Sequence, residues 1–285
     1  MKKIKCRFCY KEAQINEKCS CGCINTSTVP QDIDQNSSFE DYSYNNYDSS
    51  VFKKIFKTWN LLNSRLFISN SKFLFPLKLI FFPILPVNFG INFDNKDTFY
   101  DVGCGRGDFI RNLPPRLKTF GTDIINYKIT DLNIKIMNFE KNNNFIEYDI
   151  VRSSHSLEHS IKPKQFLNNL IKSVKGGGIL FISTPNSDFW LKNFFGENWV
   201  PLNVLSHFCI FNQRCVEEYL IENGFTIIKK GTYSNISHIE SFFKKYNLKL
   251  NKILFIILAL MLYPIFIIES LLNIGDSIYL YAEKN

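Results

Sequence analysis

The chain has 285 residues, 45% of them hydrophobic and 21% charged, a balance that favours a globular protein and excludes a disordered chain. The formal net charge of +8 favours anionic partners. Lys and Arg are scattered, with no Arg-rich or aromatic-interleaved run, so we expect no nucleic-acid partner.

Five of the eight cysteines lie within the first 23 residues. The N-terminus lacks the apolar core of a secretory signal, so we expect a cytoplasmic location, where clustered cysteines favour a metal over disulfides. Cys6, Cys9, Cys19 and Cys21 are the predicted ligands of one structural zinc. The second pair is irregular, and Cys23 could replace Cys19 or Cys21. The alternative is a set of unliganded thiols in a decayed ribbon.

We expect a cysteine-rich, zinc-ribbon-like segment over residues 1–30 and a linker with an apolar helical arm over residues 31–96. Polar residues dominate the start of this arm, and helical spacing follows in residues 51–67. Three prolines interrupt the apolar run of residues 73–86. We expect this run to cover the active site and join the core; contact with a membrane surface is the alternative.

From residue 98 onward, strand-like and helix-like segments alternate, which predicts a parallel sheet whose ligands bind beyond the carboxyl ends of its strands. A helix before the fifth strand is expected to end at the three glycines of residues 176–178. The predicted strands are residues 98–102, 117–122, 134–137, 147–154 and 179–186.

The first predicted strand runs into the glycines of a Gly-x-Gly-x-Gly turn, Gly103, Gly105 and Gly107. Glycines allow a sharp turn and the close approach of a nucleoside ligand, and this spacing differs from the dinucleotide fingerprint. Asp123 ends the second strand about 20 residues on, where it could accept hydrogen bonds from ribose hydroxyls. A capping or turn aspartate is the structural alternative.

Three of the four histidines fall where an acceptor would bind: His155 and His159 after the fourth strand, and His207 after the fifth. A neutral histidine can take the proton of a hydroxyl group near pH 7. We rank His155 first as the base because it leaves the strand tip earliest. Each of the three could instead be a scaffold residue. Glu158 has too few partners in the sequence to be assigned as a second acid, and we expect no metal-ligand cluster with it.

These motifs resemble those of class I S-adenosylmethionine-dependent methyltransferases. The subgroup is the one related to ubiquinone-biosynthesis O-methyltransferases and to polysaccharide-cluster methyltransferases. The similarity runs from about residue 97 to the C-terminus. The residues that carry it are 101–109, 121–123, 156–159, 176–186, His207 before Phe208 and Phe211, and Gly224-Phe225.

The resemblance implies an α/β methyltransferase domain over residues 97–285. Its Rossmann-like seven-stranded sheet would have helices on both faces and an antiparallel last strand at residues 276–282. The glycines would pass under the methionine portion of S-adenosyl-L-methionine, with Asp101 near its amino group. The implied cofactor-binding residues are Asp101, Gly103, Cys104, Gly105, Gly107, Asp123, Asn138 and Ser154.

Two inserts follow the fifth strand. Aromatic residues in 187–211 predict a substrate lid, whose rings could stack on a sugar or an isoprenoid ring or form the lid's own core. In the insert of residues 244–272, an apolar stretch at 253–268 follows several lysines. As a helix it would reach about 24 Å, short of the ~30 Å bilayer core, so we expect an interfacial membrane contact. A buried dimerisation or lid helix is the alternative.

We therefore expect an enzyme that O-methylates a saccharide or saccharide-lipid intermediate at the inner face of the cytoplasmic membrane. A quinone-type or other small-molecule methyltransferase is the first alternative. A non-catalytic, cofactor-binding partner in a polysaccharide assembly complex is the second. A homodimer is compatible with each of these expectations.

Overall fold

The computed structural model describes residues 3–26, 50–69, 71–88, 90–234, 237–249 and 252–285. Residues 27–30 of the predicted cysteine-rich segment and residues 31–49 of the predicted linker lie outside these ranges. The strands are β1 Lys3–Lys5, β2 Glu12–Gln14, β3 Ile24–Asn25, β4 Thr98–Val102, β5 Lys118–Asp123, β6 Ile134–Ile136, β7 Tyr148–Ser154, β8 Val174–Pro185, β9 Cys209–Ile210, β10 Phe225–Tyr233 and β11 Ser277–Lys284.

Helices lie between most strands of the main sheet, whereas β5 and β6 are joined without one. The α-helices are α2 Ser50–Ile68, α3 Phe75–Phe81, α4 Asp108–Arg111, α5 Pro163–Lys172, α6 Lys192–Phe195, α7 Val200–Asn203, α8 Gln213–Glu222, α9 Ser237–Lys245 and α10 Lys252–Leu271. The 3₁₀ helices are η1 Lys72–Leu74, η2 Phe139–Lys141, η3 Leu157–His159 and η4 Gly196–Asn198.

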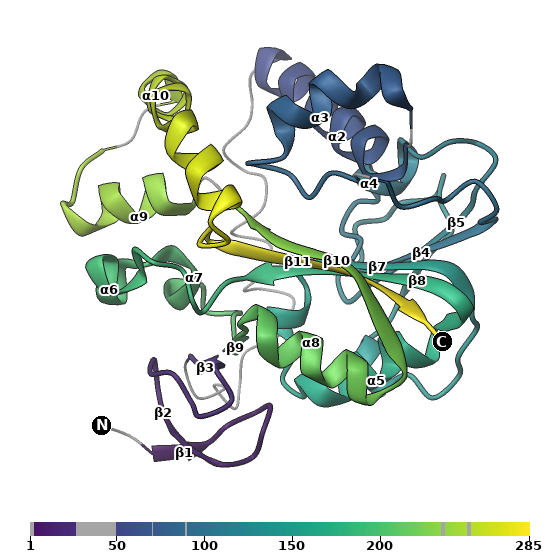
Figure 1. The fold of residues 1–285 in the computed structure, drawn as a ribbon, viewed down its shortest axis with the longest axis horizontal. Helices are drawn as coiled ribbons and strands as arrows, with labels where there is room; N and C mark the ends of the chain where they lie inside the picture. The colour runs from purple at the N-terminus through teal and green to yellow at the C-terminus, as the bar shows by residue number, and fades with distance from the viewer. Residues whose placement is uncertain (1–2, 27–49, 70, 89, 235–236, 250–251) are drawn as a thin grey trace.

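The central sheet has seven strands in the order β10-β11-β8-β7-β4-β5-β6 (Figure 1). Parallel pairing joins β8, β7, β4, β5 and β6, whereas β11 is antiparallel to both of its neighbours. The predicted Rossmann-like sheet with an antiparallel last strand is therefore confirmed. Because successive strand residues face opposite sides, each buried strand supplies both cores.

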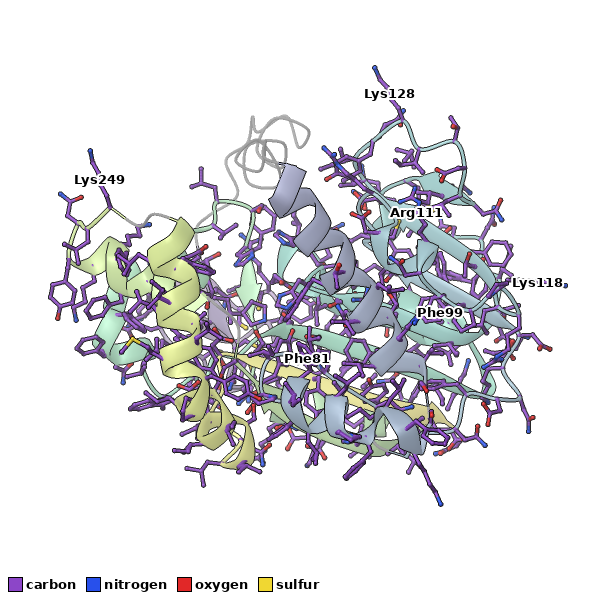
Figure 2. All side chains as sticks on the ribbon, turned by 90° about the horizontal axis from the view of Figure 1, so that it is seen from above. Phe81, Phe99, Arg111, Lys118, Lys128 and Lys249 are labelled. Carbon is purple, nitrogen blue, oxygen red and sulfur yellow. The ribbon has the colours of Figure 1, made fainter. Side chains whose placement is uncertain are left out.

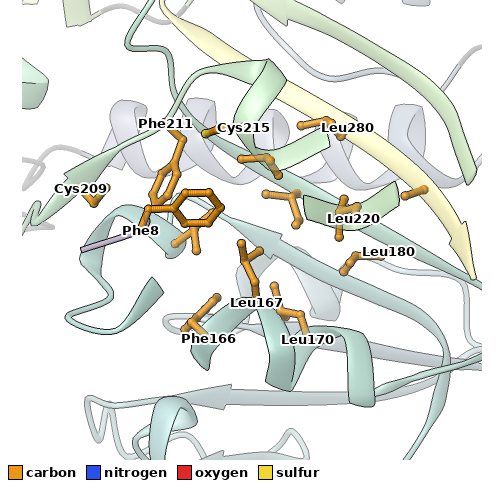
Figure 3. Close-up of a cluster of buried hydrophobic side chains, with 14 of the residues drawn as sticks. Phe8, Phe166, Leu167, Leu170, Leu180, Cys209, Phe211, Cys215, Leu220 and Leu280 are labelled. Atoms are coloured by element: carbon orange, nitrogen blue, oxygen red, sulfur yellow. The ribbon is translucent and has the colours of Figure 1, made fainter. Parts of the chain in front are cut away.

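One core lies between the sheet and α5 and α8, and the other between the sheet and α2 and α4. In β8, Leu180 and Ile182 face the first core, while Ile179 and Phe181 face the second. Figure 3 shows the first core, in which Phe8 from the N-terminal segment joins side chains of the sheet and of both helices. The N-terminal segment is thus packed onto the sheet domain.

The end of α5 differs from the expectation. The helix ends at Lys172, and Gly176, Gly177 and Gly178 belong to β8 instead of closing the helix. A Cβ at Gly178 would lie 2.8 Å from the carbonyl oxygen of Lys175 and 3.1 Å from that of Asp149. Glycine is required here because the start of β8 runs close to other backbone, a contact that local sequence does not reveal.

The apolar run of residues 73–86 packs beside α2, where Phe81 meets Trp59 edge to face. None of its residues lines the cavity described below, so the expectation that it covers the active site is not met. Among the described residues, no helix is both long enough and apolar enough to cross a membrane.

Candidate active site

A cavity of about 540 Å³ opens beyond the carboxyl ends of β4, β5 and β7. Residues after these strands form one side of it. The segment after β8, together with α7 and α9, forms the other side. Ligands of α/β proteins bind at this edge of a parallel sheet. Where the strand order reverses, the loops of neighbouring strands run in opposite directions and leave a crevice between them.

The glycine turn after β4 is fixed to the neighbouring strand. The backbone N–H groups of Gly103 and Cys104 both donate to the carbonyl oxygen of Thr122, at 2.8 and 3.0 Å. Gly103, Gly105 and Gly107 all have positive φ angles, so each favours glycine. Gly105 lines the cavity, and a Cβ placed on it would meet nothing within 4 Å. That space is suited to a ligand lying against the backbone.

Asp123 lies at the tip of β5 and also lines the cavity. Its carboxylate accepts hydrogen bonds from the backbone N–H groups of Gly105 (2.7 Å) and Ile125 (2.9 Å). Burial raises the pKa of Asp123, although these donors oppose the shift. A carboxylate held in this way can accept two further hydrogen bonds, as the vicinal hydroxyls of a ribose would donate.

Asp101 does not reach the cavity. It is fully buried, and both carboxylate oxygens accept hydrogen bonds from Arg152 at 2.9 and 3.1 Å. The two residues are register partners on β4 and β7, and the guanidinium also lies 3.8 Å from the ring centroid of Phe109. The expectation that Asp101 contacts the cofactor's amino group does not agree with this placement. Arg152 within a buried strand was the sequence signal for such a pair, since a buried cation needs an acid.

The other predicted cofactor residues divide into two groups. Gly103 and Asn138 line the cavity, and the Asn138 side chain accepts a hydrogen bond from the Glu140 N–H, which caps η2. Cys104, Gly107 and Ser154 do not line it. The Cys104 thiol is buried beside Gly121, where a Cβ would lie 2.7 Å from its Sγ. These three residues do not face this cavity, although Cys104 lines a smaller pocket of about 210 Å³ beside the glycine turn.

All three predicted histidines line the cavity. Both ring nitrogens of His155 are engaged: Nδ1 lies 3.2 Å from Glu158 Oε1, and Nε2 lies 2.7 Å from the Tyr233 hydroxyl. Burial acts to lower the pKa of His155, but Tyr233 and the Glu158 carboxylate outweigh it and raise the pKa to about 10. His155 is therefore protonated near neutral pH, which disfavours it as a general base.

Glu158 has the partners that the sequence did not predict. Its second oxygen accepts a hydrogen bond from Thr184 Oγ1 at 2.9 Å. Burial acts to raise the pKa of Glu158, but the hydrogen bond and charge of His155 outweigh it and lower the pKa to about 2. Glu158, His159 and His207 also place potential metal-ligand atoms within 4.8 Å of one another. The expectation that no metal-ligand cluster accompanies Glu158 was wrong, because His207 comes from a distant segment of the chain.

His159 and His207 lie together, with ring centroids 4.6 Å apart. Their Nδ1 atoms face backbone carbonyl oxygens, that of Ser206 at 3.0 Å and that of Pro201 at 2.8 Å. A carbonyl only accepts, so Nδ1 carries the proton in each ring and Nε2 carries the lone pair. Burial lowers both pKa values, that of His207 to about 4. Both rings are therefore neutral near pH 7.

Three residues of this site were missed from the sequence. The Tyr233 hydroxyl bridges His155 and Ser183 Oγ, with 2.7 Å to each. Glu240 of α9 and Asp276, just before β11, line the acceptor side of the cavity. Each lies far from the motifs along the chain, and a lone Tyr, Glu or Asp outside a motif gives no signal of its own.

The predicted zinc ligands come together in the N-terminal segment. The Sγ atoms of Cys6 and Cys21 are 3.7 Å apart and those of Cys9 and Cys19 are 3.4 Å apart, and all four lie within 4.8 Å of one another. Tetrahedral ligands ~2.3 Å from a zinc ion would be separated by ~3.8 Å, so this set suits the ion. The Cys23 thiol instead lies 3.3 Å from Cys215 in the core.

Comparison with known proteins gives the following similarities. A family model described as a methyltransferase domain matches residues 82–230. A stretch of 114 residues is 42% identical to the mitochondrial ubiquinone biosynthesis O-methyltransferase of Dictyostelium discoideum, covering 31% of this chain and 35% of that protein. Another, of 108 residues, is 32% identical to the uncharacterized protein MJ0906 of Methanocaldococcus jannaschii, covering 33% and 30%. The chain thus spans about a third of the length of the curated relatives it matches.

Among solved structures, the magnesium protoporphyrin IX methyltransferase of Synechocystis PCC 6803 is 13% identical in sequence. The match covers 87% of this chain and 94% of that one, with a TM-score of 0.46.

Proposed function

This chain belongs to the methyltransferase-domain family, and we propose that it is an enzyme that transfers the methyl group of S-adenosyl-L-methionine to a hydroxyl group of a neutral saccharide, free or lipid-linked. The observation that carries the proposal is one cavity with two unlike ends. A glycine turn and Asp123 form one end, and two neutral imidazoles with Glu240 form the other.

The residues at the cofactor end fit S-adenosyl-L-methionine. Asp123 would accept hydrogen bonds from the ribose hydroxyls, and the open space beside Gly105 would hold the portion that crosses the glycine turn. Asn138 and Phe139 line the cavity after β6, next to where the adenine would lie. When bound, the cofactor supplies an electrophilic methyl group on a positively charged sulfur.

The acceptor end favours a neutral, hydroxyl-bearing group. The described residues that line the cavity include no Lys or Arg. They do include the acids Glu240 and Asp276. Within the described part of the chain, the Glu240 carboxylate has no hydrogen-bond partner, and burial raises its pKa. A buried carboxylate is stabilised by a hydrogen-bond donor, which a sugar hydroxyl offers and a phosphate does not. A phosphate of a lipid-linked acceptor would remain outside the cavity.

With the cofactor bound, an acceptor oxygen would bond to the methyl carbon, and the sulfur would leave with the electron pair of the broken carbon–sulfur bond. The hydroxyl proton passes to an imidazole Nε2, and we assign this role to the pair His159 and His207, because both are neutral with Nδ1 protonated. His155, held between Glu158 and Tyr233, is a positioning residue that fixes the loop after β7. Alignment of acceptor and methyl group supplies much of the rate enhancement.

A phenolic acceptor of the quinone type is the second candidate. It is favoured by the identity with part of a ubiquinone biosynthesis O-methyltransferase and by the apolar residues Val200, Val204 and Leu205 on the cavity wall. Such an acceptor also carries a hydroxyl proton for the same imidazole pair.

The first experiment measures cofactor binding by calorimetry with S-adenosyl-L-homocysteine. Asp123→Ala should weaken binding at least about tenfold, because hydrogen bonds to a charged group contribute ~1.5–3 kcal/mol. Asp131→Ala, an exposed aspartate paired with Arg111, is the matched control and should bind normally. Equal affinities of the two variants, or no binding by the parent chain, would refute the cofactor assignment.

The second experiment measures transfer of a labelled methyl group to neutral glycosides, their sugar phosphates, glycolipid fractions and phenols. We expect label in the neutral saccharides, and His207→Asn should lower kcat ~100-fold or more with cofactor affinity unchanged. Label in sugar phosphates would contradict the neutral acceptor, and label in phenols alone would support the quinone-type candidate. Cofactor binding without transfer to any fraction would favour a non-catalytic partner in a polysaccharide assembly complex.

We also propose one structural zinc ion held by Cys6, Cys9, Cys19 and Cys21. The separations of their sulfur atoms match a tetrahedral site, and Cys23 lies with Cys215 outside the set. A zinc ion there would fix the fold of the N-terminal segment, since short segments with few apolar residues need such a constraint.

A further inference from the structure

Helix α10 exposes an apolar stripe and buries its polar residues. The exposed positions of its described side chains recur at helical spacing, and every one of them is apolar: Ile257, Leu260, Met261, Pro264, Ile265, Ile268 and Leu271, with Leu272 just beyond. Leu260 and Met261 are 71% and 70% exposed. By contrast, Glu269 and Ser270 face inward. A helix on the surface of a soluble protein has the opposite pattern, so this face is built to be covered.

A second apolar element lies beside α10. Phe73, Phe75, Leu79 and Ile80, from η1 and α3, are all exposed. The Tyr263 hydroxyl of α10 donates a hydrogen bond to the Ile80 carbonyl oxygen, so the two helices are in direct contact.

The contact between the two elements continues past α3. Ser270 Oγ of α10 donates to the Pro83 carbonyl oxygen at 3.2 Å. In Figure 1, α10, α2 and α3 lie along the top of the molecule, and Figure 2 looks down on that side. The two stripes, 180 residues apart in sequence, therefore form one surface, here called the α3–α10 face.

The two sequence segments that form the α3–α10 face carry mostly positive charge. All charged residues of the sequence between positions 50 and 93 are Lys or Arg. Between positions 241 and 275 the sequence has four lysines and one acid, the buried Glu269. Lys72 belongs to η1, and Lys244 and Lys249 precede α10 in the sequence; all three are exposed. An apolar surface with a basic border matches the acyl region and the anionic head groups of a bilayer.

We propose that the α3–α10 face docks the protein on the surface of a membrane that contains anionic phospholipids, with the apolar stripe in the acyl boundary and the lysines at the head groups. The same charges argue against a second copy of the chain as the occupant, because a two-fold contact would place the basic border against itself. The proposal does not depend on the identity of the methyl acceptor.

The lid connects this surface to the active site. Trp190 Nε1 donates a hydrogen bond to Glu269 Oε1 of α10 at 2.8 Å, while Glu240 of the neighbouring α9 lines the cavity. The lid thus contacts the inward side of α10 and also forms part of the cavity wall.

The test is co-sedimentation of the full chain with vesicles of phosphatidylcholine alone and of phosphatidylcholine mixed with phosphatidylglycerol. We expect binding to the mixed vesicles that weakens as salt is added. Leu260→Asp/Met261→Asp should reduce that binding at least about tenfold, since two apolar side chains would no longer enter the bilayer. Lys244→Glu/Lys249→Glu should reduce binding to the mixed vesicles only.

The matched control is Ile146→Asp/Ile221→Asp, which places the same charges on side chains that are 69% and 53% exposed elsewhere. It should bind vesicles as the parent chain does, and all variants should unfold at similar temperatures because the substituted side chains are exposed. Equal binding by Leu260→Asp/Met261→Asp and the parent chain would overturn the proposal, as would no binding by the parent. If the parent chain forms a dimer without lipid and Leu260→Asp/Met261→Asp dissociates it, the face would instead bind a second copy of the chain.

Discussion

Two glycines of the turn after β4, Gly105 and Gly107, have different surroundings. Gly105 faces open space in the cavity, whereas a Cβ on Gly107 would lie 2.4 Å from Leu132 Cδ1 and 2.9 Å from Ile134 Cδ1. Gly105 leaves room for a ligand, and Gly107 lets α4 begin against the β5–β6 connection. The same residue type in one motif therefore serves binding at one position and packing at the other.

Alanine substitutions separate these two roles. Gly105→Ala should weaken S-adenosyl-L-homocysteine binding at least about tenfold by filling ligand space, while its positive φ lowers stability by only ~1 kcal/mol. Gly107→Ala should cost ~2 kcal/mol or more, because it adds a clash to the same strain. Calorimetry and urea unfolding of both variants measure the two effects. Equal losses of stability would show that the space beside Gly105 is not open.

His207 makes stability depend on pH. Burial lowers its pKa from 6.5 to about 4, so the folded protein binds this proton less readily than the unfolded chain. Stability from His207 is therefore complete above pH 6.5 and is lost as pH falls from 6.5 towards 4, by on the order of 3 kcal/mol. His207→Asn can keep a hydrogen bond to Pro201 but does not titrate. Urea unfolding between pH 4 and 7.5 should show a smaller loss for this variant than for the parent, and identical slopes would contradict the buried neutral ring.

The N-terminal segment supports the element that carries His207. Strand β3 pairs with β9, with Ile24 opposite Ile210, and the Thr26 hydroxyl donates to the His207 carbonyl oxygen. Phe8 meets Phe211 edge to face at 5.7 Å. The described part of the cysteine-rich segment thus supports the acceptor side of the cavity through β9.

Loss of the four-cysteine site should therefore impair the acceptor end of the cavity and leave the cofactor end largely unchanged. In Cys6→Ser/Cys9→Ser we expect loss of bound zinc, a lower unfolding temperature and loss of methyl transfer, because β3 no longer holds β9. Affinity for S-adenosyl-L-homocysteine should change less than about threefold. Metal content, calorimetry and labelled transfer measure these effects. Cys23→Ser is the control that should retain zinc, and loss of the metal from it would place Cys23 among the ligands.

The aromatic residues of the lid were predicted either to stack on a substrate ring or to form the lid's own core. Trp199 is fully buried and joins Phe189, Phe195 and Ile210 in a small core. Phe189, Phe195 and Trp199 thus stabilise the lid itself, whereas Phe194 is 46% exposed. Trp190 is half exposed but is held by Glu269 of α10.

Ligand binding should stabilise the entire sheet domain, because the cavity joins the ends of β4, β5 and β7 to the lid. At a concentration of S-adenosyl-L-homocysteine about 100 times its Kd, stability should rise by ~2.7 kcal/mol. For a domain of this size the unfolding temperature should increase by roughly 5 to 10 °C. Thermal unfolding with and without ligand measures the shift, and Asp123→Ala should show little or none. A shift of equal size in that variant would mean that the ligand binds elsewhere.

Much of the fold could be read from the sequence because its signals are local. Buried strands are continuous apolar runs, and β4 has the predicted bounds, while the alternation of strands and helices specified a parallel sheet. The glycine turn and Asp123 were recognisable because a ligand beside a strand tip requires those residue types at that spacing. The four cysteines were recognisable because paired cysteines at short spacing are a local pattern, and the structure brings their four sulfur atoms within 4.8 Å of one another.

The rest depends on contacts between distant segments. The sequence ranked His155 first as a base, but its protonation is set by Glu158 and by Tyr233, which lies 78 residues away. Asp101 looked like a ligand residue until its register partner Arg152 was placed beside it. The α3–α10 face arises only when two apolar stretches lie side by side. Local patterns fix elements and motifs, whereas pKa values, ion pairs and surfaces depend on which elements the chain brings together.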